Sequence, residues 1–214
     1  MSRTLRRRYR ERGIDDAVFL RSMLDLRYKL YECYEAYGIW GSFFSWWFSG
    51  FFKMKLFGIG RLQFEIRPFG MTYTSRGVTL IPASPVISVH IPSSGEPFTS
   101  ECVWESYRAA ADFFREELAG APVVFYCNTW LFFKRHWEIL APTSNIYRFM
   151  SDYDMCEYGD YEDYTQAWRR FGIYYTGNPD DMPADSSLRR AYVELMRRGE
   201  PIGWGTGVLV YKEK

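Results

Sequence analysis

The chain has 214 residues, a formal net charge of +1, 47% hydrophobic residues and 25% charged residues. These proportions are typical of a globular protein and exclude a disordered chain. A net charge this small also excludes a global field that would recruit nucleic acid or an acidic membrane. Aromatic residues make up 20% of the chain, so we expect some rings to line a cleft or an interface.

The cysteines and histidines are too few and too scattered for a metal cluster. The four cysteines form no Cys-x-x-Cys pair, and the histidines are His90 and His136, so we predict no metal site. No secretory leader pattern is present, which favours a cytoplasmic protein with free thiols. Cys102 and Cys127 are interpreted as small buried side chains; a cysteine nucleophile would need His136 as its base.

Two helices are predicted at the start of the chain. Six arginines lie within residues 3–12, which indicates a solvated helix end, with an RNA or lipid contact as the alternative. A second helix is expected from Asp15 to Gly38, its C-cap. Its buried stripe is predicted from apolar side chains at alternating spacings of four and three, namely Phe19, Met23, Leu26, Leu30, Cys33 and Tyr37.

Residues 36–52 form a 17-residue segment without charge that is rich in Trp and Phe. A membrane-spanning helix needs about 20 apolar residues, and serines and glycines dilute this segment, so no span is expected. We interpret it as packing between the helical region and a sheet. The alternatives are an aromatic wall of an acyl pocket and an interfacial membrane contact.

A strand is predicted over 58–67, with alternating apolar and polar side chains. Its polar face is expected to be solvated; if that face borders a cleft, Glu65 becomes a candidate base. Residues 71–74 and 78–81 are expected to pair across 75–77, and 86–91 to form the central strand. The region is therefore predicted to be an antiparallel meander.

The central strand ends in His90, and a turn of small residues follows before the next helix. The first turn of a helix presents free backbone N–H groups, so such a turn can hold an anion. Thr99 or Ser100 is the expected N-cap. The buried face of this helix is predicted to carry Val103, Tyr107, Ala110, Phe114 and Leu118. A second apolar strand, 123–126, leads to Asn128.

The remaining elements are a short helix over 131–140, a strand or extended piece over 146–153 and a solvated acidic loop over 152–163. An acidic collar that attracts an amine is the alternative for that loop. Asp185 or Ser186 is expected to start a last helix that Gly199 ends, followed by a strand over 203–211.

Several ordered motifs together resemble a known family. They are His90-Ile91-Pro92, 106–114, Cys127 with Trp130-Leu131, Ser144-Asn145-Ile146 with Phe149, and 183–191 followed by Gly199. This succession resembles the GNAT-like C-terminal domain of a bacterial acyltransferase family. Upstream, Tyr9 with Arg12-Gly13-Ile14, Trp47 and 60–65 are similar to the helical N-terminal domain that accompanies it.

The resemblance implies an α+β fold with a GNAT-like mixed, mostly antiparallel sheet flanked by helices. It also implies a helical N-terminal region over 1–58, with the acyltransferase domain over 59–214. The expected activity moves an acyl group from acetyl-CoA or another acyl-CoA to a small-molecule amine, with no nucleic acid as partner. The N-terminal region is shorter than in that family, so we expect an upstream piece to be missing.

The resemblance also suggests site residues. His90 is a candidate base, or it holds its turn through a buried hydrogen bond. Tyr147 is the candidate acid and Asn128 a contact to the cofactor. The cofactor's phosphates would lie at Ile91, Ser93, Ser94 and Gly95.

The expected phosphate loop departs from the usual Arg/Gln-x-x-Gly-x-Gly/Ala pattern. Pro92 and Pro97 have no N–H group, and Glu96 would repel a pyrophosphate. A GNAT-shaped binding module without catalysis is therefore the alternative function. The sequence does not determine the acyl chain, the acceptor or the oligomeric state.

Overall fold

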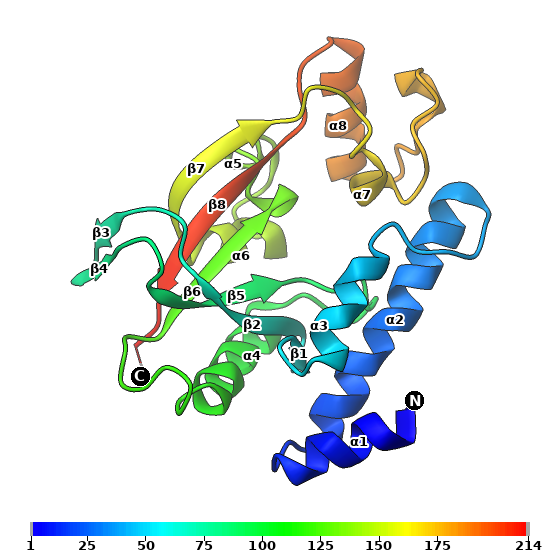
Figure 1. Ribbon diagram of the computed structural model, residues 1–214. Helices are drawn as coiled ribbons and strands as arrows, with labels where there is room; N and C mark the ends of the chain where they lie inside the picture. The colour runs from blue at the N-terminus through cyan, green and yellow to red at the C-terminus, as the bar shows by residue number, and fades with distance from the viewer. Residues whose placement is uncertain (1, 213–214) are drawn as a thin grey trace. The chain divides into compact units, whose positions relative to one another are not determined.

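The computed structural model describes residues 2–212, which divide into two compact units (Figure 1). The first comprises 2–29, 43–127 and 208–212, and the second 30–42 and 128–207. The fold is α+β, with helices flanking a mostly antiparallel sheet, as predicted. The strand order in this sheet is β1-β2-β5-β6-β8-β7, and β3 and β4 form a separate two-stranded sheet.

The first unit holds most of the sheet and the helices before it. Its helices are α1 (Ser2–Glu11), the part of α2 (Asp16–Tyr37) up to Lys29, a 3-10 turn (Ser45–Trp47), α3 (Phe48–Phe52) and α4 (Ser100–Phe113). Its strands are β1 (Phe57–Ile59), β2 (Leu62–Pro68), β3 (Tyr73–Ser75), β4 (Val78–Leu80), β5 (Pro85–His90) and most of β6 (Val124–Thr129).

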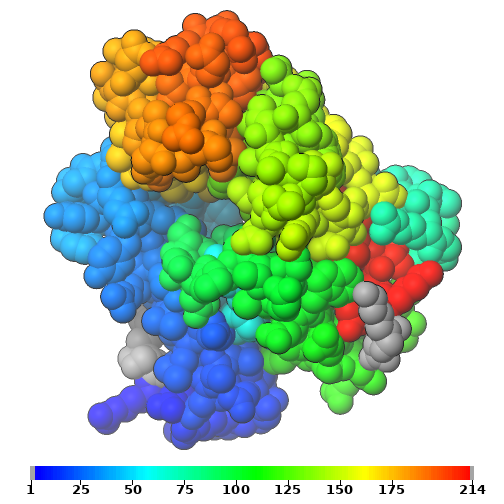
Figure 2. All heavy atoms as spheres, turned by 180° about the vertical axis from the view of Figure 1, so that it is seen from behind, coloured from blue at the N-terminus to red at the C-terminus, as the bar shows by residue number. Residues whose placement is uncertain are grey.

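Helix α4 packs on the sheet through an aromatic layer within the first unit. The Tyr107 ring lies 4.7 Å from Phe125 and 6.3 Å from Phe64, and all three residues are fully buried. Thr99 is the N-cap, and its side chain accepts a hydrogen bond from the Cys102 N–H, as predicted. The opposite face of α4 is exposed and carries the charged residues Glu105, Arg108 and Asp112. Figure 2 shows the green central part of the chain from behind.

The second unit contains the rest of α2 and the C-terminal elements. These are a 3-10 turn (Trp130–Phe132), α5 (His136–Ile139), α6 (Asn145–Ser151), β7 (Asp154–Asp160), α7 (Trp168–Phe171), a 3-10 turn (Pro179–Asp181), α8 (Ser187–Arg197) and most of β8 (Gly203–Val210). Their core surrounds Phe133, Phe171 and Tyr192. Helix α8 begins at the N-cap Ser186, and Gly199 beyond its end has a φ of +67°, as the sequence predicts.

The predicted strand over 58–67 is a hairpin instead, because the chain turns at Gly60 and Arg61. Gly60 has a φ of +60°, and a Cβ there would collide with Ser106 Oγ. The same hydroxyl accepts a hydrogen bond of 2.8 Å from the Arg61 N–H. The hairpin therefore lies directly on α4.

The stripe predicted for α2 is only partly right. Phe19 and Cys33 are buried, but Leu30 and Tyr37 are 40% and 43% exposed. Ser22 and Asp25 are fully buried instead. The Ser22 hydroxyl accepts a hydrogen bond from the Gly58 N–H, so this helix face meets the polar edge of β1. A search for periodic apolar residues cannot predict such a polar buried face.

The prediction that the charge-free segment 36–52 packs in the core is also largely wrong. Ala36 and Phe51 are buried, but Ile39, Trp40 and Trp46 are more than 60% exposed. Downstream, the predicted strand over 146–153 is helix α6, because Ser144 caps it by accepting from the Tyr147 N–H. The acidic region expected to be a loop contains β7.

His136 lies in a buried polar network of the second unit. Its Nδ1 donates to the Leu131 carbonyl at 2.8 Å, and its Nε2 accepts from the Tyr192 hydroxyl at 2.7 Å. Burial lowers the pKa of His136 from 6.5 to about 4.

This shift predicts acid-sensitive folding. Below pH 6.5 His136 becomes protonated in the unfolded chain. In the folded chain it stays neutral down to about pH 4. The free energy of unfolding should therefore fall as the pH drops through this window, by about 3 kcal/mol in total. Urea unfolding at pH 7, 5.5 and 4.5 measures it. The variant His136→Gln should have a shallower slope, and an unchanged slope would contradict the assignment.

Candidate functional site

The site begins where β5 leaves one of its two neighbours. On one side β5 pairs with β2 along its length, and His90 lies opposite Gln63. On the other side it pairs in parallel with β6 only at Ile87 with Phe125 and at Ser88 with Tyr126. Within the described residues, the ladder with β6 thus stops two residues before β5 ends.

His90 and Glu65 are brought together at this strand end. The His90 Nε2 lies 3.0 Å from Glu65 Oε1, and the two side chains are 21% and 20% exposed. The hydroxyl of Ser88 is a longer contact to the same nitrogen, at 3.4 Å. With Nε2–H donated to the carboxylate, the Nδ1 lone pair of His90 is left to accept a proton. The polar face of β2 is therefore not simply solvated, and the role of Glu65 stays a prediction.

Trp47 also contacts the imidazole of His90. Its ring lies edge-on to His90, with centroids 4.7 Å apart and planes at 84°. Its indole N–H donates to Asp25 Oδ2 at 3.1 Å, and Asp25 is fully buried in α2. The aromatic segment thus contributes one ring to the surroundings of His90, and the interpretation as a wall of an acyl pocket stays a prediction.

The turn after His90 is organised by Arg61. Its Nη1 donates to the Pro92 carbonyl at 3.0 Å, and its Nε lies 3.2 Å from the carbonyls of Glu96 and Pro97. The guanidinium also lies over the Phe98 ring, 5.4 Å from its centroid. Burial lowers the pKa of Arg61. This turn is thus fixed by a cation that binds its carbonyl oxygens.

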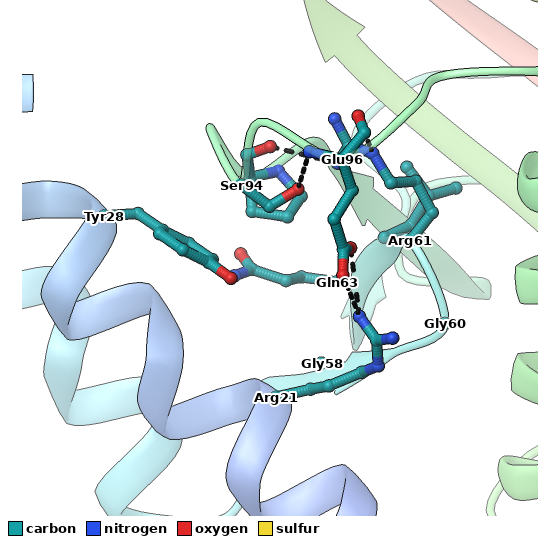
Figure 3. Close-up of a pocket in the computed structure, with 10 residues that line it drawn as sticks. Arg21, Tyr28, Gly58, Gly60, Arg61, Gln63, Ser94 and Glu96 are labelled. Atoms are coloured by element: carbon teal, nitrogen blue, oxygen red, sulfur yellow. Dashed lines mark hydrogen bonds and ion pairs between the residues drawn. The ribbon is translucent and has the colours of Figure 1, made fainter.

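A pocket lies between α2, the β1–β2 hairpin and this turn, all within the first unit (Figure 3). Arg21 closes one side, with its Nη1 at 3.1 and 3.3 Å from the two carboxylate oxygens of Glu96. Arg21 therefore balances the charge of Glu96, and the expected repulsion of a pyrophosphate stays a prediction. Ser94 lines the pocket, and its hydroxyl accepts a hydrogen bond from the Glu96 N–H.

The other predicted site residues lie in different surroundings. Ile91, Ser93 and Gly95 are in the turn, and Gly95 has a φ of +73°. Asn128 and Tyr147 belong to the second unit. There Asn128 Nδ2 donates to Thr206 Oγ1 at 2.8 Å, and the Tyr147 ring packs edge-on against Trp137. The roles of these residues stay predictions.

The structure does not support Cys127 as a nucleophile with His136 as its base. Cys127 is fully buried, and burial raises the pKa of its thiol. Both ring nitrogens of His136 bind Leu131 and Tyr192, as described above, so this histidine is no base for a thiol. Across residues 2–212, no three His, Cys, Asp or Glu side chains converge as a set able to hold a metal ion.

Sequence reasoning missed Arg21, Arg61 and Asp25. Arg21 and Asp25 lie on the helix predicted from its apolar stripe, and Arg61 lies in a turn that was taken for strand interior. One signal was present: Gly60 before Arg61 marks a possible turn between two short strands. Nothing local marks the pairing of Arg21 with Glu96, 75 residues away.

The comparisons with known proteins identify the family. Residues 56–209 match the GNAT-like C-terminal domain, and residues 1–54 match the N-acyltransferase N-terminal domain. The chain therefore belongs to the family with this GNAT-like C-terminal domain, as the sequence motifs suggested. The predicted domain boundary at residue 58 stays a prediction. No curated protein matches the sequence.

Solved structures share this fold. An acyltransferase in complex with decanoyl-CoA and teicoplanin has a TM-score of 0.80 at 24% identity, and an acyltransferase with decanoyl-CoA has 0.79 at 22%. An acyltransferase mutant with octanoyl-CoA has 0.80 at 23%. The alignments cover 97%, 97% and 98% of this chain but 62%, 62% and 63% of those chains. This chain thus spans less than two thirds of their length, and the likeness shows the fold alone.

One further feature concerns the membrane. None of the helices within residues 2–212 combines the length and the apolar character that crossing a bilayer requires.

The role of Arg61 yields a prediction about the turn. Arg61→Met keeps the aliphatic stem but removes the charged hydrogen bonds to the turn carbonyls, so stability should fall by about 2 kcal/mol. Amide exchange at 94–96 should also become faster. Urea unfolding and hydrogen exchange measure both effects.

The control is Arg67→Met, on the strand β2 that follows this turn; the Arg67 side chain is 56% exposed. It should change stability by less than about 0.5 kcal/mol. Equal losses in the two variants would contradict the role given to Arg61.

Proposed function

We propose that the protein is an acyl-CoA-dependent N-acyltransferase that transfers an acyl group from the thioester to an amine. The observation that carries this proposal is the His90–Glu65 pair at the end of β5, where β5 and β6 stop pairing. A base at this edge would face a thioester lying between the two strands. Such a base is what amine acylation needs, because the attacking amine must lose a proton.

The geometry of the pair supports the following steps of the proposed reaction. His90 Nδ1 takes the proton of the amine, directly or through water, as the nitrogen attacks the thioester carbonyl. Glu65 stabilises the imidazolium through the 3.0 Å contact to Nε2. Trp47 keeps the ring plane fixed, with its own orientation set by Asp25. The tetrahedral intermediate then expels the coenzyme A thiolate, which receives a proton.

We also propose roles for the residues of the second unit. Asn128 would contact the pantetheine part of the cofactor, and Tyr147 would protonate the leaving thiolate. Ile91, Ser93, Ser94 and Gly95 would lie along the phosphates. The fixed carbonyls of this turn and its two prolines leave few N–H donors, so a pyrophosphate would depend more on neighbouring cationic side chains than in a glycine-rich loop.

The acyl donor is proposed from the neighbours of the same fold. Those acyltransferases are in complex with decanoyl-CoA and octanoyl-CoA, so a medium-chain donor is a better first choice than acetyl-CoA. A catalytically inactive module remains the second candidate, favoured by the turn between Pro92 and Pro97.

The decisive experiment compares binding and transfer. Calorimetry with decanoyl-CoA should show binding to the wild type and to His90→Gln alike. Release of coenzyme A in the presence of a panel of primary amines should be slower in His90→Gln by about 100-fold or more, because the proton acceptor is lost. Glu65→Gln, which keeps the size and a hydrogen-bond acceptor, should cost less than His90→Gln.

One further variant and the wild type test the alternatives. Tyr147→Phe should slow transfer if the tyrosine is the acid and leave it unchanged if it is not. Binding of decanoyl-CoA with no transfer by the wild type to any amine would favour the inactive module. Absence of binding would overturn the proposed function.

A further inference from the structure

The pocket near His90 holds polar groups that the transfer mechanism does not use. Its lining comes from α2 (Arg21 and Tyr28), from the β1–β2 hairpin, and from Pro92, Ser94 and Glu96 of the turn (Figure 3). No lining residue comes from β6. The pocket therefore lies on the β2 side of β5, whereas the thioester slot proposed above lies on the β6 side.

Gln63 connects this pocket to the catalytic pair. It is the ladder partner of His90, and it stands two residues before Glu65 on the same face of β2. Gln63 is 3% exposed, and its amide group points toward Tyr28 in Figure 3. It lines the pocket, so a ligand there would lie beside the ladder partner of His90.

The Arg21–Glu96 pair indicates which chemical group the pocket takes. One nitrogen of Arg21 contacts both oxygens of Glu96, at 3.1 and 3.3 Å, which is longer than the 2.7–2.9 Å typical of charge-assisted hydrogen bonds. Both side chains are 43% exposed. A loosely held carboxylate on a half-exposed arginine is exchangeable, and a ligand carboxylate could engage the guanidinium through two nitrogens.

Arg61 cannot take that role, since its guanidinium already binds the turn carbonyls. It nevertheless adds positive charge beside the pocket. With Arg21, Arg61 and Glu96 together the lining carries a net charge of +1, which becomes more favourable to an anion when Glu96 turns away.

We propose that this pocket binds a carboxylate group of the acyl acceptor, which displaces Glu96 from Arg21 and leaves the acceptor amine close to His90. The inference rests on the proposed function and adds the class of acceptor, an amine that also bears a carboxylate. Glu96 keeps the arginine occupied in the empty enzyme and competes with the ligand.

The test uses two product analogues that differ only in charge, N-decanoylglycine and N-decanoylglycinamide. Calorimetry measures both, together with decanoyl-CoA, on the wild type, Arg21→Gln, Glu96→Gln and the control Arg67→Gln. The wild type should bind the carboxylate about 10-fold more tightly than the amide. Arg21→Gln should lose this preference, Glu96→Gln should increase it several-fold, and Arg67→Gln should keep it.

The opposite results are equally clear. Equal affinity for the two glycine ligands, no binding of either, or a preference that persists in Arg21→Gln would overturn the assignment. A matching loss of decanoyl-CoA affinity in Arg21→Gln would place the arginine at the cofactor phosphates and overturn it too. If decanoyl-CoA binds the wild type while the glycine ligands are not distinguished, the proposed function stands and only the acceptor class fails.

Discussion

The antiparallel ladder between β2 and β5 is the constraint on which the site depends. Its register sets Gln63 opposite His90 and Glu65 opposite Ser88, so groups separated by 25 residues in sequence meet on one face. Because side chains alternate along a strand, a slip of one residue would turn Glu65 away from His90. Helix α4 supports this register, through its aromatic layer with Phe64 and through the hydroxyl of Ser106 at the hairpin turn.

The arginines near the turn after β5 bind carbonyl and carboxylate groups of that turn. Arg61 binds the backbone of the turn and Arg21 binds a side chain of that turn, so the two arginines fix the segment that follows the central strand. Glycine-rich turns at this place offer N–H groups to a phosphate. In this chain Pro92, Glu96 and Pro97 occupy that place, and the two arginines bind groups of the turn itself.

Much of the fold could be predicted because local signals were strong. The cap of α4, the apolar face from Val103 to Leu118 and the end of α8 at Gly199 follow from residue types alone. The predictions for the segments of α6 and β7 were wrong. A cap at Ser144 outweighed a short apolar run, and acidic residues occupy a strand in which no residue is buried. Pairing of His90 with Glu65 could be suspected from strand alternation, but Arg21, Arg61 and Asp25 depend on long-range packing that no local pattern records.

The hydrogen bond from Trp47 to Asp25 bears on modularity. Trp47 contacts the His90 ring at the end of β5 and donates this hydrogen bond to the buried carboxylate of Asp25 in α2. All three residues lie in one compact unit. The two family domains meet near residue 55, in the interior of that unit. Recombination at this junction would separate the tryptophan and its anchor from the histidine, so the two parts are expected to be inherited together and a chimaera should exchange them as a pair.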